Sequence, residues 1–156
     1  MFVSLDLETT GFDPSTNKII EFGAIKFDLQ GKQETLRFFV NPGIILPQII
    51  THITNITDKD LQTAADFSEK IAEIKDFIGD LPIIGHNIQF DIGFLKSNKV
   101  EINNPTYDTQ ELSSIFIPNL PSYSLEIISS RLKLKHHEKH RALDDSIAAM
   151  ELFLKL

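Results

Sequence analysis

The sequence opens with Phe2-Val-Ser-Leu-Asp-Leu-Glu8, in which apolar and polar residues alternate. In a β-strand, residues i and i+2 point to the same face. The pattern therefore predicts a strand over residues 1–8, with Asp6 and Glu8 side by side on one face and the apolar residues on the other. Two ionised carboxylates this close are unfavourable unless a cation lies between them, and Mg²⁺ and Mn²⁺ prefer carboxylate oxygens. A metal site and a merely solvated polar face both fit this strand.

The rest of the chain predicts one α/β domain over residues 1–156. Further strands are expected over 18–27, 33–40, 82–85 and 106–108, and helices over 65–79, 109–115, 124–132 and 141–156. Helical signals also begin near Pro47, and Asn87 is expected to cap a helix that follows it. Three successive strands predict an antiparallel meander, and the later alternation of strand and helix predicts a mixed sheet flanked by helices.

Composition excludes several classes of protein. The chain has no cysteine, so disulfides, thiolate zinc sites and a cysteine nucleophile are excluded. No apolar run approaches the roughly 18 residues of a membrane span, and Asp6 and Glu8 interrupt any signal peptide, so no membrane association is expected and a cytoplasmic location is the default. The net charge of −7 disfavours coating of duplex nucleic acid by basic patches, although bound dications would offset it. A basic run over 131–141 indicates a solvated loop or a surface that steers phosphate.

The predicted C-terminal helix carries a carboxylate, Asp145, on an apolar face. Its apolar residues fall into two stripes at helical spacing, one of Leu143, Ile147, Met150 and Leu154, the other of Ala148, Ala149 and Leu152. Asp145 lies with the second stripe, whose alanines favour close approach to a sheet. A carboxylate on a buried face needs a partner, which is either a basic residue or a metal.

Three segments that carry acidic residues follow one another along the chain: Asp6-Leu-Glu-Thr-Thr-Gly11, Gly85-His-Asn-Ile-Gln-Phe-Asp91 and His140-Arg-Ala-Leu-Asp-Asp145. Each has an ordinary structural explanation alone; Asp91, for example, could be a first-turn acid stabilised by the helix dipole. Together they resemble the DnaQ-like 3′–5′ exonucleases of the DEDDh type, whose pattern is D-x-E-T-T-G, H-N-x-x-F-D and H-x-A-x-x-D. The resemblance runs from about residue 2 to the last helix.

This resemblance implies an RNase H-like α/β fold with a five-stranded mixed sheet whose first three strands are antiparallel. It also implies a set of site residues. The ligands of two Mg²⁺ or Mn²⁺ ions would be Asp6, Glu8, Asp91 and Asp145, and His140 would be the general base. The residues that it places at the substrate are Thr9, Thr10, Gly11, Thr54, Asn87 and His140. Asn55 stands where the related L-T-G-I-T motif has glycine, and asparagine tolerates left-handed backbone geometry.

The implied activity is metal-dependent hydrolysis of single-stranded DNA from its 3′ end to nucleoside 5′-monophosphates. The enzyme would act in proofreading or repair, alone or with a DNA polymerase or a DinG-like helicase. An exoribonuclease similar to oligoribonuclease or RNase T is the alternative, but Thr9-Thr10 replaces the Met-Thr typical of oligoribonucleases and so favours DNA. A third hypothesis is a non-catalytic binding module on the same fold. Degenerate relatives usually lose an acid or the histidine, and this chain retains all five residues.

Overall fold

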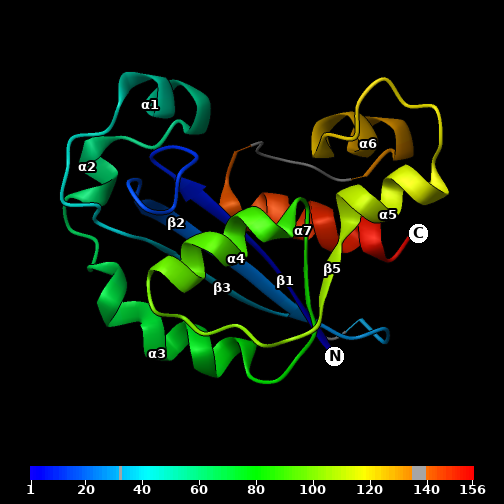
Figure 1. The fold of residues 1–156 in the computed structure, drawn as a ribbon, viewed down its shortest axis with the longest axis horizontal. Helices are drawn as coiled ribbons and strands as arrows, with labels where there is room; N and C mark the ends of the chain where they lie inside the picture. Colours follow the sequence, from blue (N-terminus) through cyan, green and yellow to red (C-terminus); the bar gives the residue numbers. More distant parts are fainter. Residues whose placement is uncertain (32, 135–139) are drawn as a thin grey trace.

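A five-stranded mixed sheet of order β3-β2-β1-β4-β5 forms the centre of the computed structural model, which describes residues 1–31, 33–134 and 140–156 (Figure 1). The central strand, β1 (Phe2–Thr9), is antiparallel to β2 (Ile19–Phe27) and parallel to β4 (Ile83–Gly85). Outside them, β3 (Gln33–Phe39) is antiparallel to β2, and β5 (Thr106–Asp108) is parallel to β4. The predicted mixed sheet with three antiparallel leading strands is confirmed.

The helices of the described residues are α1 (Gln48–Thr54), α2 (Asp58–Leu61), α3 (Phe67–Ile78), α4 (Ile88–Ser97), α5 (Thr109–Phe116), α6 (Leu125–Leu132) and α7 (Ala142–Phe153). The predicted strands and helices end within three residues of these bounds. None of the helices in this part of the chain has the length and apolar character needed to cross a bilayer. Residues 135–139 of the predicted basic run lie outside the described residues.

The two faces of the sheet are covered by different helices (Figure 1). Val3, Leu5 and Leu7 of β1 pack in the main core with buried side chains of α3 and α4, such as Ile74 and Phe94. The opposite face of the sheet, which carries Asp6 and Glu8, is covered by α7. The Ser4 hydroxyl, on that same face, donates a hydrogen bond to the Ser146 carbonyl at 2.8 Å. The alternation in the opening strand therefore separates core from site as predicted.

Helix α7 lies directly against the backbone of β2. A Cβ added at Gly23 would lie 2.2 Å from backbone atoms of Ala142 and Leu143, so only glycine fits there. The alanine stripe of α7 is buried, as predicted. The prediction of the other apolar stripe, which includes Leu154, was only partly correct, because the Leu154 side chain is 48% exposed. The helix ends at Phe153, so Leu154 no longer follows the helical spacing.

Candidate active site

Strand β1 has one partly open edge, and the site forms there. Strand β4 pairs with β1 only at Val3 and Ser4. Beyond these pairs, the backbone N–H of Leu7 donates to Asp91 Oδ1 at 2.9 Å instead of to a neighbouring strand. Asp91 is 1% exposed and lies in the first turn of α4. This bond brings the third predicted acid next to the strand that carries the first two.

The start of α4 is held by a residue that the sequence did not single out. Asn87 is the N-cap residue, with a left-handed φ of 61°, but its side chain makes no capping bond, so the expected cap was wrong in detail. The Asp108 carboxylate accepts from the backbone N–H groups of Asn87 at 3.0 Å and Ile88 at 3.1 Å. It also accepts from Gln110 N at 2.8 Å and so caps α5. An Asp directly before a predicted helix was the available signal.

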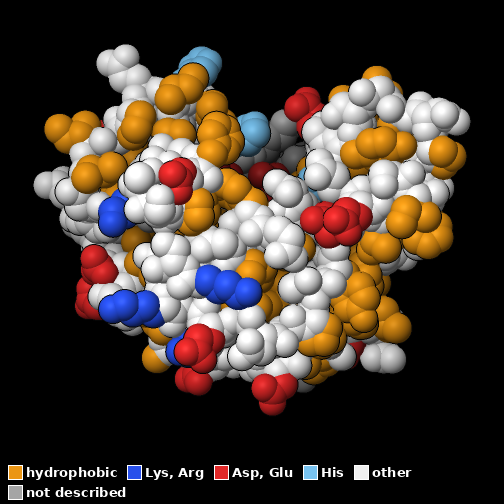
Figure 2. Space-filling view, in the orientation of Figure 1, with side chains coloured by type: hydrophobic (Ala, Val, Ile, Leu, Met, Phe, Trp, Pro, Cys, Tyr) orange, Lys and Arg blue, Asp and Glu red, His pale blue; other side chains and the backbone are white. Residues whose placement is uncertain are grey.

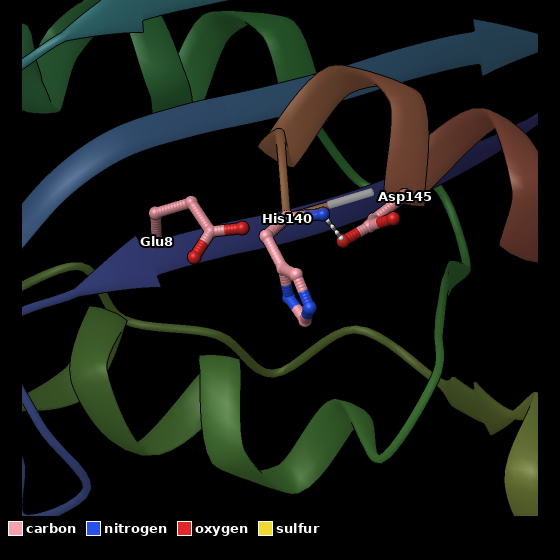
Figure 3. Close-up of side chains that lie close together, drawn as sticks. All are labelled: Glu8, His140 and Asp145. Carbon is pink, nitrogen blue, oxygen red and sulfur yellow. Dashed lines mark hydrogen bonds between the residues drawn. The ribbon is translucent and has the colours of Figure 1, made fainter. Parts of the chain in front are cut away.

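Glu8, His140 and Asp145 converge from β1 and the start of α7 (Figure 3). One potential ligand atom from each lies within 4.8 Å of the other two. The backbone N–H of His140 donates to Asp145 Oδ2 at 3.2 Å. His140 is exposed and has a left-handed φ of 58°, whereas the two acids are partly buried. The structure thus brings together residues that are 132 positions apart in the chain.

The electrostatics of this group favour a bound cation. Burial, followed by the carboxylates of Asp91, Asp145 and Glu8, raises the pKa of Asp6 well above its ordinary value. Burial and neighbouring carboxylates, with Asp145 foremost, raise the pKa of Glu8 to about 8. Burial also raises the pKa of Asp91, against the lowering effect of the Leu7 N–H. For Asp6 and Glu8 every one of these influences acts in the same direction, and a divalent cation would oppose them all. The donor set therefore fits hard dications.

Sequence reasoning also missed Glu21 of β2, which is 0% exposed and lies opposite Glu8 in the strand register. It forms ion pairs with Arg37 and Arg141. An acid inside the apolar run Ile19-Ile-Glu-Phe22 was the signal that could have found it, because a buried carboxylate requires partners.

The other predicted substrate residues lie at or just after the ends of β1 and α1. Thr9 Oγ1 donates to the Gly11 carbonyl at 2.7 Å, and Thr10 Oγ1 accepts from Lys18 N at 2.9 Å. Thr54 Oγ1 donates to the Ile50 carbonyl at 2.9 Å. The next residue, Asn55, has a left-handed φ of 57°, consistent with its tolerance for that geometry. These hydroxyls shape the turns after β1 and α1, and their contact with substrate stays a prediction.

The surface is hollowed between the side formed by α1 and the side formed by α5 and α6, with histidine and acidic side chains deep in the hollow (Figure 2). Large apolar side chains are exposed on the α1 side, among them Ile45 at 84% and Ile49 at 61%. Phe12, just beyond the turn that follows β1, is 90% exposed. Apolar side chains are thus open to solvent on the α1 side of the surface and after β1.

This fold and this cluster of acids define an exonuclease: the chain belongs to the exonuclease family whose model matches residues 3–153. Within that family it is a DnaQ-like exonuclease domain of the DEDDh type, as its motifs indicated. Exonucleases of this family depend on metal ions.

Relatives of known sequence include DNA polymerases. The PolC-type DNA polymerase III of Thermotoga maritima is 35% identical over 161 residues, and the match covers 99% of this chain but 12% of that protein. The PolC-type DNA polymerase III of Clostridium perfringens is 32% identical over 155 residues, and the match covers 97% of this chain and 11% of that protein. The DNA polymerase III subunit epsilon of Aquifex aeolicus is 31% identical over 160 residues, covering 99% of this chain and 79% of that subunit. The chain thus spans about a tenth of the PolC-type relatives and most of the epsilon subunit.

Solved structures share the fold. Exonuclease I superimposes with a TM-score of 0.83 at 20% identity, covering 97% of this chain and 39% of that one. Exonuclease X in complex with 5′ overhanging duplex DNA gives a TM-score of 0.77 at 21% identity, covering 99% and 90%. These likenesses confirm the RNase H-like α/β fold that the motifs predicted.

Proposed function

We propose that this domain removes nucleoside 5′-monophosphates from the 3′ end of single-stranded DNA, using two Mg²⁺ or Mn²⁺ ions. The convergence of Glu8, His140 and Asp145 within 4.8 Å, beside the buried acids Asp6 and Asp91, is the observation that carries this proposal. A surface salt-bridge network would not place so many carboxylates where each raises the pKa of another.

In this proposal Asp6, Glu8, Asp91 and Asp145 hold the cations. Two dications would neutralise charge at the scissile phosphate and lower the pKa of the attacking water. The protein fixes these ligands in different ways: β1 holds Asp6 and Glu8, the Leu7 N–H orients Asp91, and the His140 N–H orients Asp145. These contacts hold the four carboxylates on elements that meet at the edge of the sheet.

His140 is proposed to act as the general base. Imidazole suits the role because its charge changes near neutral pH, and this ring is exposed beside Glu8 and Asp145. It would accept a proton from the attacking water, whose oxygen forms the new bond to phosphorus. The bond from phosphorus to the 3′ oxygen of the preceding nucleotide breaks, and that oxygen takes up a proton from solvent.

Two observations support single-stranded DNA as the substrate. The relatives at 31–35% identity are subunits or forms of DNA polymerase III, which suggests association with a polymerase here as well, with a helicase as the other candidate partner. Exposed Phe12, Ile45 and Ile49 offer apolar surface to unpaired bases. Duplex DNA, whose bases are stacked inside the helix, would leave these side chains without such contacts.

The direct test is degradation of matched 5′-labelled DNA and RNA oligomers with Mn²⁺ and with EDTA. A ladder shortening from the 3′ end, abolished by EDTA and by Asp145→Ala, is the expected result. Asp144→Ala is the matched control, since it removes the adjacent acid from the same turn of α7, and should retain activity. Faster cleavage of RNA than of DNA would favour the exoribonuclease instead, and an active Asp145→Ala protein would contradict the proposed site. No cleavage of either polymer by a protein that fails to bind Mn²⁺ would favour a binding module.

A further inference from the structure

Glu21 is a buried carboxylate that the proposed mechanism leaves without a role. Its Oε1 accepts from Arg37 Nε at 2.8 Å and from Arg141 Nη2 at 3.1 Å. Its Oε2 accepts from Arg141 Nε at 3.2 Å and from the backbone N–H of Ala142 at 3.2 Å. The side chain is wholly buried, and among the described residues these contacts oppose the cost of burying its charge, so losing them together would be strongly destabilising.

Three of the four contacts belong to the segment that delivers the site to the sheet. Arg141 is the N-cap residue of α7, Ala142 is its first helical residue, and His140 comes directly before them. The Arg141 carbonyl accepts from the backbone N–H of Asp145 at 3.0 Å. Glu21 therefore holds the start of α7 through the backbone of Ala142 and the side chain of Arg141. Both residues lie in the chain between His140 and Asp145, which approach Glu8.

This segment has little freedom to settle elsewhere. Ala142 packs against Gly23, two residues along β2 from Glu21, at a distance that leaves no room for a Cβ. His140 has a left-handed φ of 58°, a conformation that non-glycine residues keep only where the surroundings impose it. The bond from His140 N to Asp145 fixes one side of this residue, and the Glu21 contacts fix the other.

We propose that Glu21 is a positioning residue, which sets His140 and Asp145 relative to Glu8 by anchoring Arg141 and Ala142 to β2. The inference rests on the proposed function, because it is there that His140 and Asp145 carry the chemistry. The charge of Glu21 also raises the pKa of Asp6 and of Glu8 directly. Arg141→Gln keeps this carboxylate, so it isolates the effect on hydrolysis that is transmitted through the start of α7.

The structure supplies a matched control. Arg37 pairs with the same oxygen of Glu21 as Arg141 does, but it comes from β3, and its hydrogen bond within the described residues goes to Glu21 and not to α7. Arg37→Gln therefore removes an ion pair of Glu21 and leaves the anchor in place. Arg141→Gln removes the arginine part of the anchor and leaves the pair with Arg37 in place.

Steady-state hydrolysis of a single-stranded DNA oligomer, with saturating Mn²⁺ and well below the melting temperature of each variant, tests the proposal. Glu21→Gln and Arg141→Gln should each lower kcat by about 10- to 100-fold with little change in KM, because displacements near 1 Å have such effects. The double variant should have a kcat no lower than that of the less active single variant, since both changes break the same link. Arg37→Gln should keep kcat within about twofold of wild type, because the bonds of Glu21 to Arg141 and Ala142 stay in place.

Mn²⁺ affinity gives a second readout that does not require activity. Displacement of Asp145 should weaken Mn²⁺ binding by Glu21→Gln and Arg141→Gln, and Arg37→Gln should bind as wild type does. Equal losses in all three variants, additive losses in the double variant, or unchanged kcat in Glu21→Gln would overturn the proposal. If Glu21→Gln does not fold, Arg141→Gln carries the test, because Arg37 still pairs with the buried carboxylate. A wild-type protein that cleaves no oligonucleotide would refute the proposed function, and the Mn²⁺ affinities would still test the anchor.

Discussion

Replacing Glu8 by Gln is expected to stabilise the metal-free protein near pH 8. Burial and the neighbouring carboxylates raise the pKa of Glu8 from 4.5 to about 8, so ionising this group in the folded state is unfavourable. Since the folded pKa lies above the unfolded one, the stability that the protonated group provides is fully present below pH 4.5 and is lost as the pH rises through 8. Glutamine cannot ionise and escapes this loss.

The size of the effect follows from the two pKa values. A rise from 4.5 to about 8 corresponds to about 5 kcal/mol at a pH above both. Glu8 is only partly buried and titrates together with Asp6 and Asp91, which reduces the expected gain to about 2–3 kcal/mol. The two proteins should be similar at pH 5, where Glu8 of the folded wild type is still protonated.

Urea unfolding in EDTA at pH 5, 6.5 and 8, followed by circular dichroism, measures the difference. The exposed Glu101→Gln serves as control and should follow wild type at each pH. Mn²⁺ at about 100 times its dissociation constant should add about 2.7 kcal/mol to the wild type, and less to Glu8→Gln, which has lost a proposed ligand. Equal stability of Glu8→Gln and wild type at pH 8 would refute the account of this carboxylate cluster.

His140→Ala should lower kcat by about 10²- to 10⁴-fold and flatten the neutral limb of the pH–rate profile; an unchanged profile would remove the general base. Asp108→Ala frees two backbone N–H donors of α4 and should lower the free energy of unfolding by about 1–2 kcal/mol. Asp108→Ala should also weaken Mn²⁺ binding in titration calorimetry, whereas Asp66→Ala, at the N-cap of α3, should not. Equal Mn²⁺ affinities in the two variants would contradict a role of Asp108 in holding the site. Gly23→Ala should push α7 off β2. It should lower the free energy of unfolding in urea by about 1–3 kcal/mol and also lower the rate of hydrolysis. Hydrolysis at the wild-type rate would contradict the close packing of α7 on β2.

Local patterns were enough to predict most of the elements and the strand that carries the first acids. Alternation in β1 separates Leu5 in the core from Asp6 at the site because side chains of a strand point to opposite faces in turn. Gly79 ends α3 as expected, because its φ of 53° is unfavourable for residues that carry a Cβ. These features depend on neighbours a few residues away, which a single sequence displays directly.

Asp108 and Glu21 escaped prediction for the opposite reason. Asp108 bonds to Asn87, 21 residues earlier, and Glu21 bonds to Arg141, 120 residues later. Neither pairing leaves a local pattern, because each depends on which helix packs on which face of the sheet. The acids at the site were found through their joint resemblance to a family, and the residues that hold those acids in place became visible only in the fold.

The shortness of β4 has a consequence for how the length of this chain can vary. Because β4 stops at Gly85, Leu7 N is left for Asp91. Two more strand residues would extend β4 by about 7 Å along β1, giving Leu7 a backbone partner and moving the start of α4 away from Glu8. Insertions in the surface turns would leave this geometry unchanged. In a redesign of this domain, the number of residues between Pro82 and Asp91 is therefore a stricter requirement than the identity of the apolar residues among them.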